Sequence, residues 1–140
     1  MNTIQKVQTG FLLLMAGAFI NTGLQALFSP QDVLAQVGIE LNNSSALNSM
    51  RAIYGGMHLV FGLFCAFGGF KMRKEALGLV LLYTTGFTIG RLTGIVMDGA
   101  PNEFVTTWLL TEAFSLAVSA TLLVLDTKNY ASKPQLQSAV

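Results

Sequence analysis

The chain is 140 residues long, 52% of them hydrophobic and only 11% charged, with a net charge of +1 and a mean hydropathy of +0.57. A soluble domain carries about 25% charged residues, so this composition excludes an ordinary soluble protein and is typical of a surface that faces lipid. The low net charge and the lack of a basic stripe or tail exclude a nucleic-acid partner. The single cysteine excludes an internal disulfide and a multi-cysteine metal site.

Four apolar stretches follow one another along the chain, and each is long enough to cross a bilayer as a helix. The predicted spans cover residues 7–28, 50–70, 76–97 and 104–125. A helix of about 20 apolar residues crosses a hydrocarbon core of about 30 Å, and an open sheet would leave backbone groups unpaired in lipid. The sequence therefore predicts an all-α integral membrane four-helix bundle over residues 1–126, followed by a polar tail over residues 127–140.

The first apolar stretch also resembles a secretory signal peptide. Lys6 precedes the apolar core, and Ala16-Gly17-Ala18 resembles a cleavage site. However, the apolar run continues to Phe28, which is longer than the core of a signal peptide. We therefore expect an uncleaved span, with cleavage as the alternative.

The longest outer loop follows the first span and contains the start of a helix. Ser29 is a favoured capping residue, and Pro30 suits the first helical position. The next residues form a short apolar face, which Gly38 ends. The sequence predicts a short interfacial helix at the outer membrane surface.

Charged residues in the loops predict the orientation of the spans. Basic residues lie in the loops of one side: Lys6, Lys71, Arg73, Lys74, Lys128 and Lys133. The opposite loops are mainly acidic: Asp32, Glu40, Asp98 and Glu103. Because short basic loops stay on the cytoplasmic side, both termini and the polar tail are predicted to be cytoplasmic.

Three ionisable residues, His58, Arg91 and Glu112, fall inside the predicted spans. Each charge in hydrocarbon is costly, so such residues mark a functional site or a buried tie between helices. Counted from the cytoplasmic edges of their spans, all three lie at roughly 20–24 Å, at about 1.5 Å per residue. Arg91 and Glu112 lie level on neighbouring antiparallel helices, which predicts an ion pair.

Further polar residues extend this layer. Tyr54 and His58 follow Arg51 at helical spacing, so the three are expected to share a face. Asp98 lies two turns above Arg91 on its helix. The candidate ligand-binding residues are Arg51, Tyr54, His58, Arg91, Asp98 and Glu112. In this interpretation the arginines hold an anionic group, the acids orient the arginines, and the two ring side chains donate hydrogen bonds.

A stripe of glycines on the third span predicts close helix packing. Gly86, Gly90 and Gly94 recur every four residues, which allows a neighbouring helix to approach closely. Gly55, Gly56 and Gly62 of the second span are the expected partners. A second protomer is the alternative, so a homo-oligomer stays open.

No motif indicates an enzyme. The chain contains no metalloprotease, nucleophile-elbow, P-loop or dinucleotide-binding pattern. His58 lacks a second histidine or a thiolate partner, so we expect no metal site. The sequence predicts no cofactor and gives no positive evidence for catalysis.

The polar layer is compatible with three functions. The leading one is a pocket for a small anionic or lipid-like molecule. In the second, the Arg91–Glu112 pair only fixes helix register in a structural or accessory membrane subunit without a ligand. The third is a small proton-coupled transporter that uses Glu112 and His58, although an arginine partner opposes proton cycling because it stabilises the carboxylate.

Several motifs together resemble one family of proteins. They are Asn48-Ser49-Met50-Arg51-Ala52-Ile53-Tyr54-Gly55-Gly56, Gly90-Arg91-Leu92-Thr93-Gly94, Asp98-Gly99-Ala100-Pro101 and Glu112. Over residues 10–125 the chain resembles the DUF4345 family, which groups small bacterial membrane proteins of unknown function with four predicted spans. The resemblance implies a location in the bacterial inner membrane.

The resemblance also bears on the site. It implies that the candidate residues other than His58 form one polar constellation, whereas His58 is not part of the family pattern. The family is distantly similar to DoxX-like four-helix membrane proteins, some of them associated with redox or quinone chemistry. By analogy, a quinone-like molecule joins the expected ligands.

Overall fold

The computed structural model describes residues 1–131, and within them every regular element is a helix. The elements are α1 (Thr3–Phe28), α2 (Pro30–Ala35), α3 (Ser44–Met50), the π-helix η1 (Arg51–Gly56), α4 (Met57–Lys71), α5 (Arg73–Asp98) and α6 (Glu103–Ala131). Because α3, η1 and α4 follow without a break, they form one long helix from Ser44 to Lys71. The predicted all-α fold class is confirmed.

Within residues 1–131, four helices are long and apolar enough to cross a membrane. They are Thr3–Phe28, Ser44–Lys71, Arg73–Asp98 and Glu103–Thr127. Each contains one of the predicted spans, so the predicted count and order of spans are confirmed. Length and composition together indicate a multi-pass membrane protein.

The short helix predicted after the first span is α2. Pro30 occupies its first turn, as the sequence suggested, although the Ser29 side chain makes no capping hydrogen bond. Asp32 places an acid in the same turn. Gly38 follows with a φ of +76°, a left-handed conformation that glycine adopts without strain. The turn at Gly38 directs the chain away from α2 and toward α3.

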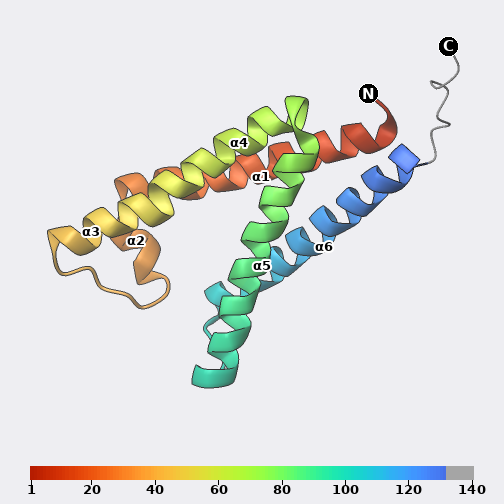
Figure 1. Cartoon of the computed structure of the whole chain (residues 1–140). Coiled ribbons are helices and arrows are strands. Elements are labelled where there is room, and N and C mark those ends of the chain that lie inside the picture. The colour runs from red at the N-terminus through yellow and green to blue at the C-terminus, as the bar shows by residue number, and fades with distance from the viewer. Residues whose placement is uncertain (132–140) are drawn as a thin grey trace, which may run out of the picture.

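The four long helices form two antiparallel pairs, α1 with α4 and α5 with α6 (Figure 1). The pairs meet where α1 begins, where α4 turns into α5 and where α6 ends, and they diverge toward their other ends. Buried apolar side chains fill the meeting end: Leu12, Ala16, Cys65, Leu77, Val80 and Leu122. Two buried side-chain hydrogen bonds also join helices there, from Gln8 Nε2 to the Leu122 carbonyl and from Thr9 Oγ1 to the Gly69 carbonyl.

Close packing of α1 on α4 depends on glycines. A Cβ atom at Gly23 would lie 2.8 Å from the backbone nitrogen of Leu59. A Cβ atom at Gly62 would lie 2.9 Å from the backbone nitrogen of Ile20. Neither backbone can move aside cheaply, so these glycines set the distance between the two helices.

The glycine stripe of α5 does not pack as we expected. Gly55 packs against Leu27 of α1, and Cβ atoms at Gly86, Gly90 and Gly94 would meet no atom within 4 Å. The reason is the divergence of the two helix pairs. α5 is closest to α4 near the turn that joins them and diverges from it further along (Figure 1), so the α5 glycines lie too far from α4 to contact it. The expected packing of this stripe on the second span is therefore absent from the described structure.

The predicted polar tail begins inside a helix. α6 continues through Ala131, and the remainder of the predicted tail, residues 132–140, lies outside the described residues. The boundary between membrane domain and tail stays a prediction.

Candidate functional site

A cavity of about 790 Å³ lies between the two helix pairs. Its volume falls within the range of about 300–1,000 Å³ that is usual for small-molecule pockets. All four long helices and α2 contribute to its walls, most of which are apolar. The polar and amphipathic lining residues are Thr22, Tyr54, His58, Tyr83, Thr84, Arg91, Trp108, Thr111, Glu112 and Ser115.

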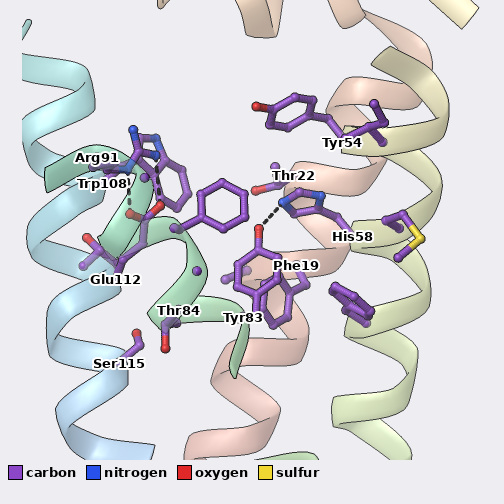
Figure 2. Close-up of a pocket in the computed structure, with 18 of the residues that line it drawn as sticks. Phe19, Thr22, Tyr54, His58, Tyr83, Thr84, Arg91, Trp108, Glu112 and Ser115 are labelled. Carbon is purple, nitrogen blue, oxygen red and sulfur yellow. Dashed lines mark hydrogen bonds and ion pairs between the residues drawn. The ribbon is translucent and has the colours of Figure 1, made fainter. Parts of the chain in front are cut away.

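Figure 2 shows how polar groups face this space from opposite walls. Arg91, Trp108 and Glu112 project from α5 and α6, whereas Tyr54 and His58 project from the helix that pairs with α1. Because the surrounding walls are apolar, these groups are the ones able to orient a bound molecule.

Arg91 and Glu112 form the ion pair that the sequence predicted. Nε of Arg91 donates to Oε2 of Glu112 at 2.6 Å, and Nη2 donates to Oε1 at 2.9 Å. The Glu112 side chain is 8% exposed and that of Arg91 is 21% exposed. A two-point, charge-assisted pair of this kind is among the strongest side-chain contacts. The prediction of a buried ion pair is confirmed.

The guanidinium group of Arg91 contacts Glu112 and Phe87 but keeps N–H donors that no described residue accepts from. Its Cζ lies 5.9 Å from the ring centroid of Phe87, one turn earlier on α5, so the ring face supports the cation. A guanidinium group has five N–H donors, and two of them bind Glu112. The other three make no hydrogen bond within residues 1–131, and the residue lines the cavity. Arg91 can therefore donate to an oxygen atom of a ligand while it keeps its partner.

His58 and Tyr83 form a second polar pair, which joins α4 to α5. Tyr83 Oη and His58 Nε2 are 2.5 Å apart, and which of them donates depends on the tautomer of the ring. Phe19 packs its ring edge-to-face against both. Nδ1 of His58 is buried without a partner at hydrogen-bonding geometry in the described chain, although the backbone of Ile53 lies near the ring.

Tyr54 stacks on His58, one turn further along the same helix. The ring centroids are 5.7 Å apart and the planes differ by 17°. The Tyr54 side chain makes no hydrogen bond to the described residues and lines the cavity, so its hydroxyl group is available to a bound molecule. Both residues of this stack were candidates from the sequence, and both lie at the cavity.

Arg51 and Asp98, the two other candidates, are not brought into the cavity. Arg51 is exposed, and its Nε donates to the carbonyl of Leu27 at the end of α1 at 3.0 Å. Arg51 starts the π-helix, which alters the phase of the side chains that follow, so it does not share the inward face of Tyr54. Asp98 is exposed at the end of α5, beyond the cavity. A ligand role for either stays a prediction.

Several polar cavity residues were not among the candidates from the sequence, and Thr22, Tyr83 and Ser115 are three of them. Tyr83 lies two turns before Arg91 on α5, with Phe87 between them, and this four-residue spacing places all three on one face. That spacing was a usable indication. Thr22 and Ser115 carry no such sign, because many threonines and serines of helices bond only to their own backbone.

The comparisons with known proteins identify a family and nothing more specific. A family model described as a domain of unknown function (DUF4345) matches residues 7–123. The resemblance found in the sequence motifs is confirmed over most of the chain. No curated protein matches the chain, and no solved structure does.

Proposed function

Since the chain belongs to the DUF4345 family, a domain of unknown function, we propose a function from its own geometry. The protein binds a small amphiphilic molecule, lipid-like or quinone-like, in the cavity between the two helix pairs. The polar end of this molecule carries an oxygen atom, anionic or carbonyl. Its body is apolar and lies against the aromatic and aliphatic walls.

One observation carries this proposal: two hydrogen-bonded pairs line the same apolar cavity, and each joins α5 to a neighbouring helix. Arg91 keeps N–H donors that Glu112 does not use, and the hydroxyl group of Tyr54, beside the His58–Tyr83 pair, makes no hydrogen bond to the described residues. Polar groups at an apolar wall are costly unless they are satisfied, and a ligand oxygen atom satisfies them. Arg91 holds this atom, Glu112 orients Arg91, and Tyr54, which stacks on His58, supplies a second hydrogen bond.

The proposal includes a location. We place the protein in the bacterial inner membrane with both termini in the cytoplasm. This is supported by Lys6, Lys71, Arg73 and Lys74, which belong to the end where the helix pairs meet. The cavity then lies in the outer half of the bilayer.

Ligand-linked stability tests this function. A molecule that binds only the folded state raises the melting temperature. Protein purified in mild detergent is expected to melt at a higher temperature than the same protein stripped of lipid. The matched control is the double variant Arg91→Met/Glu112→Leu, which keeps the side-chain volume and removes the polar head site. Equal shifts in both proteins would reflect general solvation by lipid and would contradict the proposal.

A second candidate function rests on the ion pair itself. Arg91 and Glu112 bind each other at two points and join α5 to α6, which is sufficient to fix the register of that pair. In this case the protein is a structural or accessory membrane subunit. The double variant would then be as stable as the wild type and would replace it in cells without loss of function.

A further inference from the structure

Apolar side chains lie at both ends of the cavity, toward the two predicted membrane surfaces. At the meeting end of the helix pairs, Leu77, Val80 and Leu122 belong to the packed core. At the other end, Leu34 of α2 and Phe104 of α6 line the cavity with apolar side chains. A hydrogen bond from Asn102 Nδ2 to the Gln36 carbonyl, 2.9 Å long, connects the two loops on that side. Water and water-soluble ions therefore meet apolar walls at both ends.

The side of the cavity between α4 and α5 is open. Ile53 and Met57 line the cavity and yet are 54% and 50% exposed, and Leu82 on the facing helix is 74% exposed. Gly86 and Gly90 of α5 also line this side of the cavity, and a Cβ atom added to either would meet no atom within 4 Å. We call this opening, bounded by these five residues, the lateral portal.

The lateral portal arises from the divergence of α4 and α5. Near the turn that joins them, the two helices touch closely, and a Cβ atom at Gly68 would lie 2.5 Å from that of Ala76. Further along, α5 leaves α4 (Figure 1). The rim is apolar on both helices, and in a membrane such a surface contacts acyl chains.

We propose that the cavity is entered sideways from the hydrocarbon phase through the lateral portal, and that its occupant is a membrane-dissolved amphiphile with one polar end and one apolar chain. This inference rests on the proposed function and adds the route and the form of the ligand. The polar end lies at Arg91 and Glu112, and the chain leaves through the portal among the lipids. A water-soluble anion would have to cross the apolar rim without compensation.

The α5 glycines allow the portal to be narrowed without disturbing the fold. Gly90→Leu places an apolar side chain into open space at the rim. Gly94→Leu is the matched control, because it lies one turn along the same helix, has equally open surroundings and does not line the cavity. Gly86→Leu is a second rim variant that serves if Gly90→Leu does not fold.

Trp108 reports on the cavity, since it is the only tryptophan of the chain and lines the wall. The probe is a vesicle of phosphatidylcholine brominated in its acyl chains, because bromine quenches indole fluorescence at contact. We expect the brominated chains to quench Trp108 in the wild type. Gly90→Leu should lose most of this quenching, whereas Gly94→Leu should retain it.

Three outcomes would overturn lateral entry. Equal quenching in the wild type and both rim variants would show that chains do not pass the rim. Stronger quenching by aqueous iodide, unaffected by Gly90→Leu, would indicate entry from water. Loss of quenching at high protein-to-lipid ratio would indicate that a second copy covers the portal. The melting experiment on the protein with and without lipid separates lateral entry from ligand binding. If the wild type still melts at a higher temperature before lipid is stripped, only lateral entry is contradicted. If the melting temperature does not change, the binding function is contradicted as well.

Discussion

The guanidinium group of Arg91 and the carboxylate of Glu112 meet at two points, with Nε 2.6 Å from Oε2 and Nη2 2.9 Å from Oε1. The pair links two antiparallel helices and also forms part of a cavity wall. The pair stabilises the fold because each charge compensates the other. In the proposed binding function, the N–H groups of Arg91 that Glu112 does not use donate to the ligand. Variants that remove one charge, or both, separate these contributions.

Removal of one member of the pair should destabilise the protein strongly. Arg91→Met or Glu112→Leu leaves an unpaired buried charge, at a cost of about 3–5 kcal/mol. The double variant should recover most of this loss, because no charge remains. The measurement is unfolding of the three variants in detergent, arranged as a double-mutant cycle. A double variant whose destabilisation equals the sum of the single losses would contradict a direct pair.

The hydroxyl group of Tyr83 should matter more than that of Tyr54. Tyr83→Phe removes the partner of His58 Nε2 and leaves a buried nitrogen unsatisfied, which costs about 1–3 kcal/mol. Tyr54→Phe is the control, because the Tyr54 hydroxyl bonds to nothing in the described chain. Thermal melting of the lipid-stripped proteins measures the difference. Equal effects of the two substitutions would rule out the proposed role of the Tyr83–His58 bond.

Close packing of α1 on α4 predicts a sharp contrast between two glycines of α1. Gly23→Ala forces a Cβ atom to 2.8 Å from the Leu59 backbone, so the helices must separate and the protein should lose stability. Gly17→Ala adds a Cβ atom in open space and should be neutral or stabilising by up to about 1 kcal/mol, since alanine favours helix. Unfolding of both variants in the same detergent tests this. If Gly23→Ala is tolerated as well as Gly17→Ala, the two helices are not held at glycine contact.

The proposed orientation predicts which loops are accessible from outside. Cys65 is fully buried, so Cys65→Ser gives a background without a reactive thiol. In intact cells, a membrane-impermeant maleimide should label Asn102→Cys, in the loop before α6, and should spare Lys74→Cys until the membrane is opened. The opposite labelling pattern would place the termini outside.

The parts of the structure that follow from distance along the chain could be predicted from the sequence. Span number and order depend on the length of apolar runs. The Arg91–Glu112 pair depends on depth, which residue counting supplies at a fixed rise per residue. Both features can therefore be predicted without knowing how each helix is rotated about its axis.

The parts that depend on helix rotation and tilt could not be predicted in this way. An α-helical spacing predicts that Arg51 shares a face with Tyr54, but the π-helix over residues 51–56 changes the direction in which these side chains point. The His58–Tyr83 bond joins residues on two helices whose relative rotation no residue count gives. The glycine stripe of α5 predicts close helix packing. Because the helix pairs diverge, these glycines contact no neighbouring helix, and Gly86 and Gly90 lie at the rim of the lateral portal.

The central claim is that the cavity holds an amphiphile at Arg91 and Glu112, and native mass spectrometry tests it most directly. The wild type and the double variant Arg91→Met/Glu112→Leu are extracted in the same mild detergent and compared. We predict a defined adduct of one mass on the wild type that is absent from the folded double variant. An adduct of equal occupancy on both proteins, or a bare wild type under conditions that preserve the fold, would contradict the claim.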